Sequence, residues 1–438
     1  MRRLLAFVAG IACAVGVARA DDLADCDGAA FRSAINADAA FKCVEIERQS
    51  YSANGQSFTI RALRDGSTDP QLVTQHAAET LDAMLSAMSV FDDLAPGFGF
   101  EFGNVSVLMV DPNRTVGDLA GEKFSGVFAD ANAYSFARDC VIRINIPVND
   151  KSGIEALRNT AAHELFHCVQ YWSYPKAAGV GDAAKWWVEG SAEFFANQVQ
   201  IDTERLDDLG SKFIGSIGNT PLTQQPYRSV GFFAWLWSQG PDKMAAFFKG
   251  LATGGGEASQ IDATLAAVGE MPLQAFGQAL IDGKVAMPSG YTFPAPPEQV
   301  ATTAINDDDK QIDLQVKPFT LATHALHFSN GTYNAWAGGS SFYKREQSGG
   351  EWSELDPMET IEPESCKDVR MILAARFITD SYADKVVLAA HRSKECFECT
   401  KMPKIDQCVV GKWRMSNEAL LTYLQATHGQ SETGNFSG

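Results

Sequence analysis

The sequence has little positive charge for its size. Its 438 residues contain 36 Lys and Arg against 54 Asp and Glu, which gives a formal net charge of −18. Such a chain lacks the basic field that attracts a phosphate backbone, so nucleic acid is excluded as the expected partner. Internal repeats are also absent, and 45% hydrophobic with 10% aromatic residues excludes global disorder. At ~150 residues per domain, the length predicts two or three domains.

Long apolar runs are missing after residue 20, and a membrane span requires ~20 such residues. Residues 1–20 combine a basic start, an apolar run over 4–17, and small residues at Ala18 and Ala20. This pattern is typical of a secretory signal peptide. We therefore expect a secreted or periplasmic protein without a membrane span. The sequence does not predict its oligomeric state.

The sequence contains nine cysteines, one of them inside the expected signal peptide. The other eight form an even number, which in an oxidising compartment allows up to four disulfides. Proximity favours pairing Cys26 with Cys43. For Cys168 a disulfide, with Cys140 as the candidate partner, is favoured over metal binding. Disulfides are likewise favoured over a four-thiolate zinc site for the remaining four, which are Cys366, Cys396, Cys399 and Cys408.

Residues 70–286 are expected to form one mostly helical domain. Apolar residues at helical spacing predict helices over 70–94, 154–172, 182–199, 229–237, 243–251 and 273–281. Two β-branched runs, at 105–110 and 140–146, predict strands of a small sheet. An N-terminal segment containing a disulfide, 21–69, precedes this domain.

Prolines mark the next boundary, since residues 287–300 are rich in them and predict an extended linker. Beyond it, residues 301–438 predict a β-rich domain, either a sandwich or a small barrel, which ends in a helix at 417–425. The β-rich runs lie at 311–316, 321–328, 369–377 and 385–391. The expected fold class is therefore α+β.

Histidine is rare, with seven residues in all, yet two stand in an H-E-x-x-H pattern formed by His163, Glu164 and His167. Positions i and i+4 of a helix lie ~40° apart around its axis, so both imidazoles can reach one metal ion. Apolar neighbours bury this polar stripe, and buried polar groups need partners.

A second helix offers such partners, because Glu189 and Glu193 are again four residues apart. The 21 residues between His167 and Glu189 allow one helix to end and the next to return antiparallel. Glu189 can then complete a zinc (Zn²⁺) site of two histidines and one carboxylate, with a fourth position open for catalysis. Glu193 is expected to accept a hydrogen bond from a ligand histidine. Asn159 and Gln170 can face this site or serve packing.

These motifs resemble the gluzincin metallopeptidases of the thermolysin-like clan. The resemblance is greatest to the zinc aminopeptidase branch, in which H-E-x-x-H is followed by W-x-x-E-G-x-A. The matching residues here are Trp186, Glu189, Gly190 and Ala192. Residues 226–236 resemble the branch's P-Y-x-x-G segment, so the similarity covers about residues 70–285.

The resemblance implies a zinc-dependent hydrolase of peptide bonds. In that family's terms His163, His167 and Glu189 hold the metal and Glu164 acts as general base, while Tyr227 stabilises the oxyanion. Tyr171 and Tyr174 are alternative donors for the role of Tyr227. The branch's G-A-M-E-N run, which holds a substrate's free amine, has no clear counterpart before His163. We therefore expect an endopeptidase. The alternatives are a noncatalytic binding or adhesion protein with a structural zinc site, and a zinc hydrolase of another amide or ester.

Overall fold

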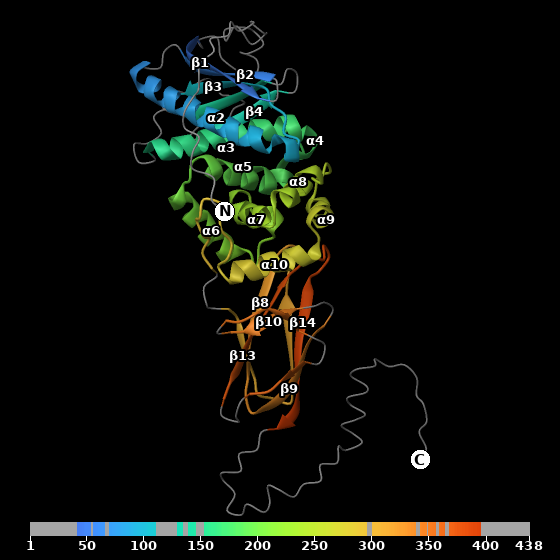
Figure 1. The fold of residues 1–438 in the computed structure, drawn as a ribbon. Coiled ribbons are helices and arrows are strands. Elements are labelled where there is room, and N and C mark those ends of the chain that lie inside the picture. The colour runs from blue at the N-terminus through green and yellow to red at the C-terminus, as the bar shows by residue number, and fades with distance from the viewer. Residues whose placement is uncertain are drawn as a thin grey trace, which may run out of the picture.

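The computed structural model falls into a mixed helix and sheet part and a β part, placed end to end (Figure 1). The first sheet lies at one end, the helices lie in the middle, and a pair of sheets lies at the other end. The structure describes residues 42–53, 56–65, 70–110, 129–134, 139–145, 153–295, 300–338, 342–347, 349–355, 359–363 and 368–395.

The first sheet has five strands in the order β1-β2-β3-β5-β4. The pairs β2-β3 and β3-β5 are parallel, and the outer pairs are antiparallel. The sequence predicts β3 and β5, and both are confirmed. It does not predict β1 and β2, which lie in the segment 21–69 and extend the same sheet, nor the edge strand β4. The strands are β1 (Cys43–Ala53), β2 (Gln56–Asp65), β3 (Asn104–Val110), β4 (Ala129–Tyr134) and β5 (Asp139–Asn145).

Helices α2 and α3 pack on this sheet, and α5 packs on α3. The helices predicted from spacing are confirmed as α2, α3, α5, α7, α8 and α10, whereas α4, α6 and α9 are not predicted. The helices are α2 (Pro70–Phe98), α3 (Gly153–Ser173), α4 (Pro175–Ala178), α5 (Lys185–Val199), α6 (Thr203–Ser216), α7 (Val230–Ser238), α8 (Pro241–Lys249), α9 (Glu257–Val268) and α10 (Glu270–Ile281). Three 3₁₀ turns join them: η1 (Gly181–Ala184), η2 (Leu222–Gln224) and η3 (Tyr227–Ser229).

Aromatic side chains fix α3 against α5. The rings of Phe166 on α3 and Phe195 on α5 stack with their centroids 4.2 Å apart, and Phe91 of α2 meets both rings edge-on. Each such pair contributes about 0.5–1.5 kcal/mol beyond the burial of its area. The two helices that carry the candidate metal ligands are thereby held at a defined spacing.

The C-terminal part is a sandwich of two sheets with its own core, and not a barrel. One sheet has the order β11-β10-β13-β8-β6, and the other has the order β12-β9-β14-β7. The helix predicted at 417–425 lies outside the described residues. The strands are β6 (Thr302–Ile305), β7 (Asp309–Gln315), β8 (Leu321–Phe328), β9 (Gly331–Gly338), β10 (Tyr343–Glu346), β11 (Ser353–Glu354), β12 (Glu359–Ile361), β13 (Arg370–Phe377) and β14 (Lys385–Glu395).

The two parts are joined by packing as well as by the linker. The Gln274 amide on α10 donates to the carbonyl of Phe377 and accepts from its N–H, a match of side chain to strand backbone. In the linker region Phe293 is buried against Gly210 of α6, so this part of the linker packs on the helices. Within the described residues, no helix is both long and apolar enough to cross a membrane.

Candidate active site

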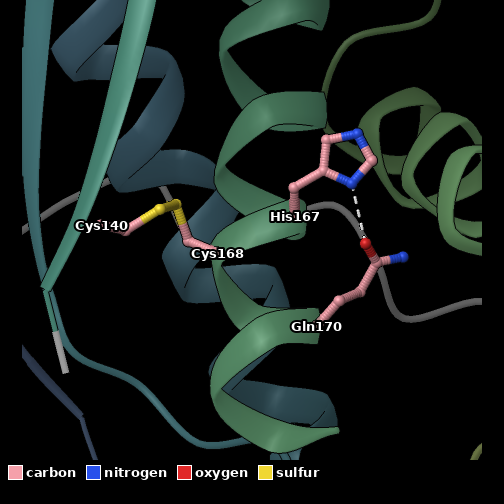
Figure 2. The surroundings of a disulfide bond; sticks show 4 residues. All are labelled: Cys140, His167, Cys168 and Gln170. Atoms are coloured by element: carbon pink, nitrogen blue, oxygen red, sulfur yellow. Dashed lines mark hydrogen bonds between the residues drawn. A yellow bond between two sulfur atoms is a disulfide. The ribbon is translucent and has the colours of Figure 1, made fainter. Parts of the chain in front are cut away.

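Helix α3 presents His163, Glu164 and His167, which are at least nine-tenths buried. The next residue, Cys168, forms a disulfide with Cys140 on β5 and so points to the sheet, away from His167 (Figure 2). The disulfide predicted for Cys168 is confirmed. Its effect is to tie the turn that carries His167 to the sheet.

Of the other cysteines in the expected mature chain, the structure describes Cys43. Cys43 is disulfide-bonded, but its expected partner Cys26 lies outside the described residues. Cys366, Cys396, Cys399 and Cys408 also lie outside the described residues.

Helix α5 brings Glu189 to both histidines. One carboxylate oxygen, Oε2, lies 3.3 Å from Nε2 of His163 and 3.3 Å from Nε2 of His167. These three residues form the group of His, Cys, Asp and Glu side chains, within the described part of the chain, whose atoms converge closely enough to hold a metal ion. The structure therefore places together the three residues that the sequence suggests as ligands.

The spacing of these atoms fits zinc. Ligand atoms ~2.0–2.1 Å from a tetrahedral zinc ion lie about 3.3–3.4 Å from one another, by the geometry of a tetrahedron. The observed 3.3 Å matches this value and is longer than the usual hydrogen bond of about 2.9 Å. Residues His163, His167 and Glu189 thus fit zinc in donor chemistry, and the two distances from Glu189 to the histidines fit it as well.

Buried acidic groups surround the histidines. Burial lowers the pKa of His163, but bonding to Glu189 and Glu193 outweighs it, and the pKa is raised. Burial raises the pKa of Glu189, but the two histidines outweigh it and hold the pKa well below its usual range. The site therefore favours a cationic occupant, either protons or a metal ion.

Glu193 lies behind His163, on the side away from Glu189. Its Oε2 is 3.4 Å from Nδ1 of His163, and its Oε1 accepts from Nε of Arg205 at 2.8 Å. The fully buried carboxylate stays ionised, because bonding to His163 and Arg205 outweighs burial and lowers its pKa to about 2. The sequence predicts Glu193 as a partner of a ligand histidine, but it does not predict Arg205, because the contact of Arg205 with Glu193 joins two different helices.

Glu164 lies beside the ligand group without joining it. Burial raises the pKa of its carboxyl group above the usual range, although the neighbouring positive histidines oppose this effect. A carboxylate with a raised pKa is a stronger base at neutral pH than an ordinary one.

Tyr227 flanks the site from η3. Its ring stacks on that of His163, with centroids 5.8 Å apart, and it remains 40% exposed. Tyr174 is an alternative donor, but its hydroxyl donates a hydrogen bond to the carbonyl of Phe98 at 2.6 Å. This phenol is therefore engaged outside the site. Burial, and then the charges of Glu189 and Glu164, raise the pKa of Tyr171, which places this phenol in the field of the site.

Other polar residues are engaged elsewhere. Asn159 donates to the carbonyl of Gln200 at the end of α5. His324 bonds Thr303 and His327 bonds Gln347, both inside the sandwich domain. None of these three residues contacts a candidate ligand through these bonds. Gln170 does, since its amide oxygen bonds Nδ1 of His167.

Comparison with known proteins adds little to this geometry. No family model and no curated protein matches the sequence. Among solved structures, an M1 zinc metallopeptidase from Deinococcus radiodurans aligns over 58% of this chain and 54% of its own, with 14% identity and a TM-score of 0.33. Aminopeptidase A from Legionella pneumophila, solved with aspartic acid, aligns over 78% of this chain and 36% of its own, with 13% identity and a TM-score of 0.36. This chain thus spans about half and about a third of their lengths, and likenesses this weak do not establish a family.

Proposed function

We propose that this protein is an exported zinc-dependent peptidase. The observation that carries the proposal is the approach of Nε2 of His163 and Nε2 of His167 to one oxygen of Glu189, at the spacing of zinc ligands. Export is supported by the signal-like residues 1–20 and by the buried disulfide, a bond typical of oxidising compartments.

The chain's own groups fit the chemistry of amide hydrolysis. Zinc held by the three ligands would polarise the substrate carbonyl and lower the pKa of a bound water to about 7. Glu164 would take the proton from the attacking water and deliver it to the leaving amine. The Tyr227 hydroxyl would donate a hydrogen bond to the oxyanion.

Two alternatives keep the same zinc ligands but give the protein another function. In a noncatalytic binding protein the zinc would be structural, but such a site has no use for the buried carboxylate of Glu164 beside the ligands. A zinc hydrolase of another amide or of an ester would use the same groups, so only substrates separate it from a peptidase.

The test is zinc analysis combined with cleavage of casein and a peptide library, with and without a chelator. We expect about one zinc per chain and cleavage that stops on chelation and returns with zinc. Bound zinc without cleavage of any peptide would contradict the peptidase, and cleavage of amide or ester reporters alone would identify the second alternative.

Endopeptidase activity is proposed on the missing G-A-M-E-N counterpart. Pairs of peptides that differ only in N-terminal acetylation test it. An endopeptidase cleaves both members at internal bonds, whereas an aminopeptidase requires the free amine and releases single residues.

A further inference from the structure

Gln170 is a fully buried residue that touches a candidate zinc ligand. It lies on α3 three residues after His167, and its Oε1 is 2.8 Å from Nδ1 of the imidazole (Figure 2). The contact lies on the far side of the ring from the nitrogen that approaches Glu189.

The orientation of the Gln170 amide is fixed by α5. Its Nε2 donates to the carbonyl of Val188 at 2.7 Å and to the hydroxyl of Ser191 at 2.8 Å, which uses both of its hydrogens. Ser191 in turn donates to the carbonyl of Trp187, so its oxygen is free to accept. The Gln170 oxygen must therefore face His167, and because it can only accept, Nδ1 of the imidazole must donate.

We propose that Gln170 is a positioning residue for the metal. By accepting from Nδ1–H it holds neutral His167 in the tautomer whose Nε2 carries a lone pair, the form that binds zinc. Since Val188 precedes Glu189 and Ser191 follows it closely, the same amide also links the two ligand-bearing helices. The inference rests on the proposed zinc site.

Zinc affinity, measured by competition with a chromophoric chelator, tests this role. Gln170→Met keeps the size of the side chain but removes the acceptor, and we expect zinc affinity to fall about 10–100-fold. Gln170→Glu restores an acceptor for Nδ1–H, so its affinity should lie closer to wild type than that of Gln170→Met.

Gln274→Met is the matched control. Gln274 is also buried with both ends of its amide bonded, but its partner is Phe377 at the junction of the two domains. We expect this variant to lose stability and to keep wild-type zinc affinity.

The outcomes separate this inference from the proposed function. If wild type binds zinc and Gln170→Met binds it equally well, or if Gln170→Glu loses as much affinity as Gln170→Met, the positioning role is refuted. A wild-type chain that binds zinc but cleaves nothing contradicts only the peptidase, because the readout is affinity. Failure of wild type to bind zinc would overturn both.

Discussion

Gly190, the residue after Glu189, is required by the close approach of η3 to α5. A Cβ added there would lie 1.9 Å from Oγ and 3.1 Å from Cβ of Ser229, and 3.0 Å from the ring of Phe233. The Ser229 hydroxyl donates to the carbonyl of Trp186 and holds η3, with Tyr227, against the site. We therefore predict that Gly190→Ala destabilises the protein and displaces Tyr227.

The magnitude follows from three effects. Overpacking a tight contact costs about 1–3 kcal/mol. Turning the Ser229 hydroxyl away loses a hydrogen bond worth about 0.5–1.5 kcal/mol. Alanine in a helix gains about 0.8–1 kcal/mol over glycine. The net expectation is a loss of about 0.5–3.7 kcal/mol in the free energy of unfolding.

The assay is calorimetric unfolding of Gly190→Ala beside Gly215→Ala. Gly215 is also in a helix, α6, but nothing lies within 4 Å of its added Cβ, so this control should be neutral or stabilised by up to about 1 kcal/mol. Turnover should fall for Gly190→Ala alone. If Gly190→Ala is as stable as the control, the close approach of η3 does not exist and the reasoning is refuted.

Further variants test the site and the disulfide that ties helix α3 to the sheet. Glu189→Ala should lose most of the zinc, and a variant that retains one zinc per chain would remove Glu189 from the ligand set. Tyr227→Phe should lower kcat by about 10²–10³-fold with little change in KM, whereas Tyr174→Phe should leave kcat unchanged because its hydroxyl is already bonded to Phe98; the reverse result would transfer the role. Replacing both Cys140 and Cys168 by serine should lower the free energy of unfolding by about 2–4 kcal/mol in denaturant titration, and unchanged stability would deny the disulfide a stabilising role.

The candidate ligands could be found from sequence because their relation is local. Two histidines four residues apart share a helix face whatever the rest of the chain does, and the same holds for Glu189 and Glu193. That the two faces meet required only a short connection between helices. The contact of Arg205 with Glu193 and the bonds from the Gln170 amide nitrogen to α5 depend instead on how the helices pack, which no spacing reveals.

The fold was predictable where apolar periodicity is strong. Strand β4 reads ADANAY, with small and polar residues that carry little β-propensity, and it exists because β5 pairs with it. Helix α6 has a local signal at its start, because Asp202 caps it by accepting from the N–H of Arg205. The match of Gln274 to Phe377 joins residues 103 positions apart and follows from no local pattern.

The most direct test of the central claim is turnover of Glu164→Gln in the zinc-loaded protein, with zinc content measured on the same sample. Because Glu164 lies beside the ligands without joining them, the variant should keep about one zinc per chain. Its kcat on a cleaved peptide should fall about 10²–10⁴-fold, the usual contribution of a positioned acid–base group. Turnover near wild type in a zinc-replete Glu164→Gln preparation would contradict a peptidase mechanism in which this carboxylate is the base.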